Sequence, residues 1–219
     1  MHKQILLLVP LAIMTGTGCA SKRDWTLVGK PENYQYRETK NKITVAAEAW
    51  TKSEDLKNVF DKNLCEKNIL PIRLVIFNYS NQTVRFSSTQ AKLRLPKGQL
   101  ISVLPDSEVS KRVEVNEAGA AGVITILTLG YGAPLAAASA QGNAKKNWKA
   151  KNAVRKCSMS LVTLDPEEAL AGFVFYDCSL RKLCRENLDP KVDLVIERMP
   201  CSVGNPLGFS IPLYVLSKE

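Results

Sequence analysis

The sequence predicts a mainly β protein: an Ig-like antiparallel β-sandwich that carries a Gly/Ala-rich helical hairpin around residues 106–156. Three observations favour this class. Short runs alternate apolar and polar residues at the period of a half-buried strand. Gly, Pro, Asn and Asp separate these runs, as they do in tight turns. One long stretch without charge, residues 118–144, interrupts the pattern. A chain of 219 residues can bury one core of this kind.

The first half of the chain holds a strand, a helix and a hairpin. Apolar residues alternate through 43–50, which predicts a strand. A Thr-to-Glu capping-box spacing follows, and the apolar residues within 56–60 predict a two-turn helix. The run 72–77 is rich in β-branched and aromatic residues, and turn residues separate it from 83–86. We expect these two runs to pair as a hairpin.

The rest of the chain returns to β structure after a helix that is expected to begin at 105–108. The run 170–176 is the candidate for a central strand. Pro212 predicts an edge position for the last strand, because proline cannot donate a ladder hydrogen bond. Further strands are expected at 91–95, 159–164, 170–176, 192–197 and 207–215.

The uncharged stretch at 118–144 contains five glycines and many alanines. Its length is that of a transmembrane helix, but Pro134 and the glycines weaken a continuous helix. We expect a helical hairpin, broken near 130–134, whose small residues let two helices approach closely and pack on the sheet. A hairpin that contacts a membrane or a partner is one alternative, and a true membrane span is another.

A tryptophan among lysines follows this stretch. Trp148 lies close in sequence to Lys145, Lys146 and Lys149. Side chains of this kind combine an apolar body with a polar end, which suits the headgroup region of a membrane. These four residues are the candidate contact with a membrane or a partner protein.

The N-terminus has the pattern of an export signal. A basic residue precedes an apolar run of about ten residues, too short for a permanent span. Small residues at 16–18 stand directly before Cys19. The segment resembles the signal and lipobox of bacterial lipoproteins, although Gly16 stands where that family prefers Leu or Val. The resemblance implies removal of residues 1–18, diacylglycerol on the thiol of Cys19, and an acyl chain on its new N-terminus.

Two or more acyl chains hold a protein stably at a bilayer. The polar residues 19–41 predict a lipidated tether, and residues 42–219 a single domain that carries the helical insertion. Ala20 and Ser21 follow the cysteine, and Ala20 stands where an Asp retains a Gram-negative lipoprotein at the inner membrane. We therefore expect a lipid-anchored protein of the cell envelope, at the periplasmic face of the outer membrane in a Gram-negative host.

Runs in three regions add a second resemblance. A strand and helix followed by "ILP" at 69–71, then "GFVFY" at 172–176 and "FSIPL" at 209–213, are similar to sandwich-type envelope lipoproteins of unknown function. This resemblance implies a fold and no activity. We expect a non-catalytic binding or scaffolding role. The alternative is a carrier of lipid or lipopolysaccharide that uses an apolar cavity between sheet and hairpin.

Charge limits the partners. Loss of Lys3 with the signal leaves a net charge of +8, from +9 for the full chain. A basic exported protein meets anionic headgroups, lipopolysaccharide or acidic wall polymer. No zinc-finger spacing or aromatic stacking motif is typical of nucleic-acid binding here. We expect a membrane and an envelope protein as partners, and no nucleic acid.

Histidine usage limits the chemistry. His2 is the only histidine, and it leaves with the signal. That excludes Ser-His-Asp and Cys-His pairs and metal sites with histidine ligands. No Walker loop, dinucleotide fingerprint or calcium loop occurs. We expect no enzyme, no metal site, and no cofactor other than the acyl groups on Cys19.

Five cysteines remain after Cys19, and an oxidising envelope favours disulfides. Cys178 and Cys184 are close enough in sequence for a local bridge. Cys157 and Cys201 each flank an expected strand and form a second candidate pair. Sequence alone leaves the pairing open.

Overall fold

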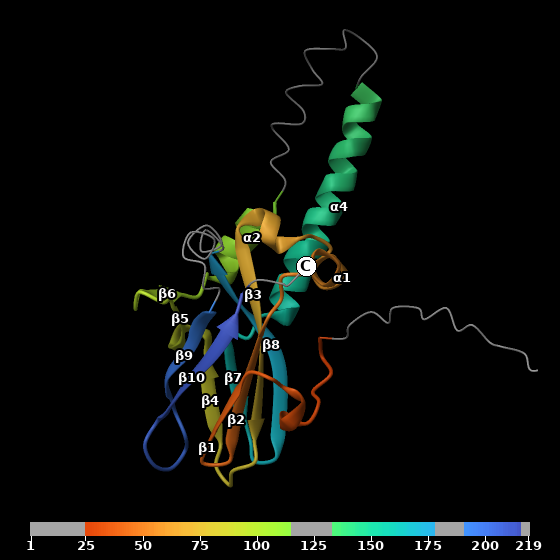
Figure 1. The fold of residues 1–219 in the computed structure, drawn as a ribbon. Coiled ribbons are helices and arrows are strands. Elements are labelled where there is room, and N and C mark those ends of the chain that lie inside the picture. Colours follow the sequence, from red (N-terminus) through yellow and green to blue (C-terminus); the bar gives the residue numbers. More distant parts are fainter. Residues whose placement is uncertain (1–24, 115–132, 178–190, 216–219) are drawn as a thin grey trace, which may run out of the picture.

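The computed structural model describes residues 25–114, 133–177 and 191–215. Within these ranges the protein is mainly β, with antiparallel sheets and three α-helices (Figure 1). The strands form the lower part of the molecule in that view, and the helices gather at the upper end. The prediction of a mainly β chain with a helical insertion is confirmed at this level.

Four strands form the first sheet, in the order β1 (Arg37–Lys40), β2 (Ile43–Ala49), β3 (Ile69–Asn78) and β8 (Glu168–Asp177). Each neighbouring pair is antiparallel. β3 is buried along its whole length. Its sequence is therefore an almost continuous apolar run rather than an alternation, as expected for a strand that is covered on both faces.

The second sheet has the order β10 (Leu207–Tyr214), β9 (Lys191–Met199), β5 (Ala91–Arg94) and β6 (Leu100–Ser102). The short strands β4 (Val84–Ser87) and β7 (Leu161–Leu164) pair in a third sheet. β10 forms an edge, as Pro212 predicts, and Pro212 lies opposite Asp193 of β9.

One hydrophobic cluster joins the sheets. Every second residue of β3 enters it, from Leu70 to Ile76. The second sheet contributes its own alternate residues, which is the period of side chains on one face of a strand. Residues contributed by that sheet include Leu93, Leu194, Ile196, Phe209, Ile211 and Leu213. Burial of these two apolar faces against each other is the main stabilising contact between the sheets.

Helices cover the other face of the first sheet. They are α1 (Ser53–Phe60), α2 (Asp106–Val113) and α4 (Ala133–Cys157), and single-turn 3-10 helices lie at Pro31–Asn33, Leu64–Lys67 and Ser88–Gln90. Apolar residues of the three helices form a second cluster with Phe173 and Phe175 of β8. The ring of Phe60 meets these two rings edge-on, at centroid distances of 5.2 and 5.8 Å. The C-terminal half of α4 packs on α1 and α2, and its N-terminal half extends beyond them (Figure 1).

Residues 25–36 lie across the same face of the first sheet, and we call them the N-terminal strap. Trp25 packs on Phe173 at 5.9 Å between ring centroids, and Tyr34 packs edge-on against Phe77 at 5.8 Å. β1 then joins the sheet. The boundary expected at 41–42 between tether and domain therefore moves toward the N-terminus, because the chain belongs to the folded body from Trp25 onward.

Two expected strand positions are wrong. β4 follows β3 along the chain but pairs with β7, because β2 and β8 already occupy both sides of β3. The run expected at the centre of a sheet, β8, lies at an edge of the first sheet. The helical insertion is present as α2 and α4, between β6 and β7. Residues 115–132, which hold most of the uncharged stretch, lie outside the described residues.

Candidate functional site

The candidate site is the solvent-facing side of α4. Along the C-terminal half of this helix, Asn147, Ala150, Val154 and Cys157 are buried, and they recur at the spacing of one helix face. At 100° per residue the opposite face carries most of the exposed residues of this half, and the exposed Lys146 lies between the two faces. The exposed residues of the opposite face are Lys145, Trp148, Lys149, Arg155 and Lys156, and we call them the outer stripe.

Buried contacts fix the orientation of the outer stripe. The ammonium of Lys62 donates to the side-chain oxygen of Asn147 at 2.6 Å and to the main-chain oxygen of Val113. Lys62 thereby ties the end of α1 to both α2 and α4. Burial and the nearby charge of Lys67 lower the pKa of Lys62, although Asp61 opposes this. On the α2 side, Lys151 forms an ion pair with Glu114.

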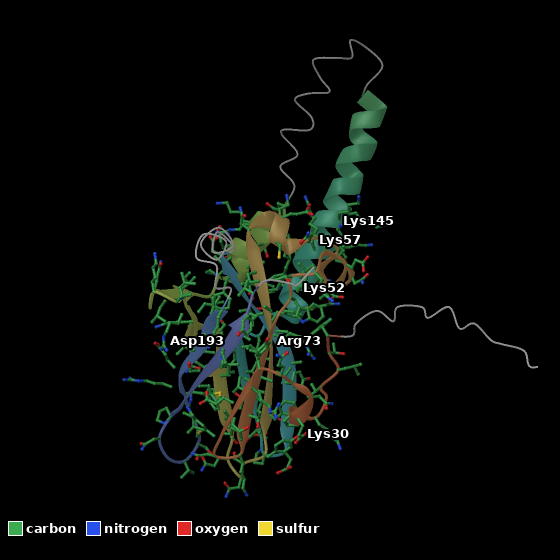
Figure 2. The ribbon with its side chains drawn as sticks, viewed as in Figure 1. Lys30, Lys52, Lys57, Arg73, Lys145 and Asp193 are labelled. Carbon is green, nitrogen blue, oxygen red and sulfur yellow. The ribbon has the colours of Figure 1, made fainter. Side chains whose placement is uncertain are left out.

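The outer stripe presents a large ring among cations. The side chain of Trp148 is 66% exposed. Among the residues that the structure describes, Lys145, Lys146 and Lys149 have no acidic partner within ion-pair distance, in contrast with Lys151. The exposed Lys52 and Lys57 of α1 extend the positive surface beside α4, and Figure 2 shows them on the same side as Lys145.

This arrangement can bind an anionic surface. The four cations of the outer stripe span positions 145 to 156, which is about 16 Å along a helix axis. An indole ring at the same level can enter the headgroup region while the lysine ammoniums meet phosphates. The sequence predicted Trp148, Lys145, Lys146 and Lys149, and the structure brings all four to exposed positions. Arg155 and Lys156 were not among the predicted contact residues, although they recur two helical turns after Trp148 and Lys149.

Cys19 lies outside the described residues. The structure does show where the chain that follows it joins the folded body. The guanidinium of Arg73 donates to the main-chain oxygens of Trp25, at 2.9 Å, and Leu27, at 2.6 Å. Its position over the sheet is labelled in Figure 2. Sequence reasoning missed Arg73. The signal available in the sequence was a single charged residue inside an apolar run. The structure leaves this residue only 5% exposed.

The expected bridge between Cys157 and Cys201 is not formed, and both side chains are free thiols. Cys157 belongs to the cluster beneath the helices, whereas Cys201 packs against the cluster between the sheets. The two thiols therefore lie in different hydrophobic clusters, on opposite faces of the first sheet. Burial raises the pKa of Cys157 to about 12 and raises that of Cys201. Cys178 and Cys184 lie outside the described residues.

Within residues 25–114, 133–177 and 191–215, His, Cys, Asp and Glu nowhere gather in a group of three that could hold a metal ion. In the same part of the chain, every helix is too short or too polar to cross a membrane.

Comparison with protein-family models, with curated proteins and with solved structures finds no match to this chain.

Proposed function

We propose that this chain is a lipid-anchored protein of the bacterial envelope with a non-catalytic binding or scaffolding role. Acyl chains on Cys19 supply membrane residence, and the outer stripe of α4 meets the headgroups or a protein partner beside them. In a Gram-negative host the location is the periplasmic face of the outer membrane. The two packed sheets favour assignment to the β-sandwich class and, more finely, to an Ig-like arrangement.

The outer stripe is the observation that carries this proposal. A surface tryptophan that is 66% exposed has apolar area to bury, and four cations beside it attract an anionic surface. Asn147 and Ala150 are buried on the opposite side of α4. The residues of the outer stripe therefore face outward as a set. Within the described ranges, none of the four cations of the outer stripe forms an ion pair with an acidic side chain.

The N-terminal strap supports the same orientation. Trp25 packs beside the helical cluster, and five residues separate it from Cys19. The six Cα-to-Cα steps between them span at most about 20 Å. A lipid on Cys19 would therefore hold the helical side of the body close to the bilayer. The +8 charge of the processed chain, computed without Lys3, acts in the same direction.

The carrier alternative requires an apolar space between sheet and helices. In the described part of the chain, aromatic rings fill that region: Trp50, Phe60 and Phe175 all pack around Phe173. This packing favours scaffolding over carriage of a lipid. The two proposals remain distinguishable, because a carrier would co-purify with lipid that mass spectrometry detects after the covalent acyl groups are accounted for.

Fractionation with crosslinking tests the proposal. The full chain and the variant Cys19→Ser are expressed in the host, and membranes are separated from soluble protein before crosslinking and pull-down. We expect the wild-type chain in the membrane fraction with a defined protein partner, and the variant in the soluble fraction without that partner. A variant that stays membrane-bound with an unchanged partner set would refute the tethering role.

A further inference from the structure

Four loops meet at the end of the molecule away from the helices. They connect β1 to β2, β3 to β4, β7 to β8 and β9 to β10, and they lie at the lower end in Figure 1. Together they line an open cleft of about 650 Å³, which we call the loop-end cleft. That volume falls within the range of about 300–1,000 Å³ that is usual for ligand sites.

Side-chain amides dominate the polar lining of the cleft. Asn41, Asn81, Gln82 and Asn205 come from three different loops. Each amide offers two N–H donors and a carbonyl acceptor. None of these four side chains makes a hydrogen bond within the described residues, so their donors and acceptors remain available to a ligand or to solvent.

Tyr79 is the aromatic residue among those that line the cleft. Tyr79 is 42% exposed and stacks on Phe77 at 6.0 Å between centroids, with 20° between the ring planes. One face of its ring is therefore supported from within the fold. A ring held in this way can pack against the apolar C–H face of a ligand while its hydroxyl stays hydrated.

Hydrogen bonds of one buried residue connect two of the loops that form the cleft. The buried side chain of Asn78 donates to the main-chain oxygens of Gln82, Leu164 and Asp165, at 2.7, 3.1 and 3.0 Å. Its oxygen accepts from the hydroxyl of Ser80 at 2.6 Å. One asparagine thus joins two of the four loops. A pre-formed site of this kind loses little conformational freedom when a ligand binds.

The geometry points to a binding site for a neutral oligosaccharide in the loop-end cleft, a function beyond membrane tethering and independent of it. Sugar hydroxyls need both donors and acceptors, which amides supply together. Sugar rings present an apolar face that suits Tyr79. Lys42 and Glu167 are the charged residues that line the cleft, and their opposite signs give no net preference for an anion or a cation.

Saturation-transfer difference NMR on the full chain tests this site, with chitotriose and maltotriose as probes. We expect transfer to ring protons of at least one trisaccharide, with a dissociation constant in the millimolar range or below. Tyr79→Ala weakens binding at least 10-fold, whereas Tyr79→Phe keeps the ring and the binding. Asn81→Ala and Asn205→Ala each weaken binding about 5-fold, as expected for one lost hydrogen bond.

The matched control is Asn58→Ala, which removes an exposed amide from α1 at the other end of the molecule. It leaves binding unchanged. The proposal is overturned if neither trisaccharide receives transfer at 10 mM, a concentration of about the order that weak sites require. It is also overturned if Asn205→Ala and Asn58→Ala bind equally well, or if trialanine receives transfer and the saccharides do not.

Discussion

The side chain of Arg73 holds the main chain at Leu27, with 2.6 Å between Nη2 and the carbonyl oxygen. Nε of the same guanidinium donates to the carbonyl of Trp25 at 2.9 Å, and the ring of Tyr34 lies 5.8 Å away. Glu48 is near, at 3.9 Å from Nη1. A buried cation with these partners fixes the N-terminal strap on the first sheet, and the strap connects the body to the segment that carries Cys19.

Replacement of Arg73 tests this role of the strap. Arg73→Met removes both hydrogen bonds to the strap and leaves two carbonyls without a donor. We expect a loss of about 2 to 4 kcal/mol in the free energy of unfolding, measured with urea. Limited proteolysis should cut the strap faster near Lys30. Arg94→Met, at an exposed arginine of β5, should change neither quantity. Equal proteolysis of the two variants would contradict the role given to Arg73.

Charge reversal on the outer stripe tests its affinity for anionic lipid. The full chain with Cys19→Ser isolates this surface from the acyl anchor, and vesicles that contain phosphatidylglycerol serve as the membrane. Lys145→Glu with Lys149→Glu should weaken binding by at least about 2 kcal/mol, or roughly 30-fold, because each lost lysine contributes about 1 kcal/mol near such a surface and each new glutamate is repelled by it. High salt should have the same effect. Co-sedimentation measures the change.

A control with the same change in charge separates the outer stripe from net charge. Arg85→Glu with Lys97→Glu reverses two exposed cations of the β structure. If this control weakens binding as much as the reversal on α4, total charge rather than the outer stripe attracts the membrane.

The buried thiol of Cys157 gives a pH prediction. Its pKa rises from 9.0 to about 12 because burial disfavours the thiolate. The folded state therefore keeps its proton where the unfolded chain has lost it. Stability from this group is present in full below pH 9 and falls as the pH rises from 9 toward 12. Urea unfolding of wild type and Cys157→Ala should show a steeper fall for wild type over this interval.

Reagent access gives an independent measure of the same thiol. At pH 8 a disulfide reagent should label Cys157 only after denaturation, because the reactive species is the thiolate. Cys201 is partly exposed and should react in the native protein, slowly because its pKa is also raised. Rapid native labelling of Cys157 would show that the helices do not cover it.

A side chain at Gly172 on β8 should be destabilising. A Cβ there would lie 3.0 Å from Cβ of Met159 and 3.2 Å from the main-chain oxygen of Cys157. We expect Gly172→Ala to lower the free energy of unfolding by about 1 to 3 kcal/mol. Gly208 on β10 is the matched control, because its nearest contact would be 3.6 Å, from the oxygen of Ile196. A change at Gly208 as large as that at Gly172 would argue against close packing of β8.

Local pattern was sufficient to place most strands and helices. Residues 43–49 alternate and form β2, and Val109 and Val113 share the buried side of α2. Pairing was less accessible, because it depends on contacts between residues far apart in sequence. Thus β4 meets β7 rather than β3. The continuous apolar run of β3 reflects burial of both its faces, one of them by the helices and the N-terminal strap. Local sequence patterns do not show which elements bury a strand.

The two candidate sites also differ in how far the sequence could predict them. The sequence predicted Trp148 and its lysines, because these residues lie close together in the chain. It missed the loop-end cleft, because Asn41 and Asn205 meet only after distant strands assemble. It also missed Asn78, whose place after an apolar run is typical of a turn residue, whereas the structure buries it as a joint between loops.

Intact-mass analysis of the processed chain from host membranes tests the central claim most directly. The account predicts a polypeptide that begins at Cys19 and exceeds the mass of residues 19–219 by one diacylglycerol group and one acyl chain. An unmodified thiol at Cys19, or a chain that retains residues 1–18, would contradict it.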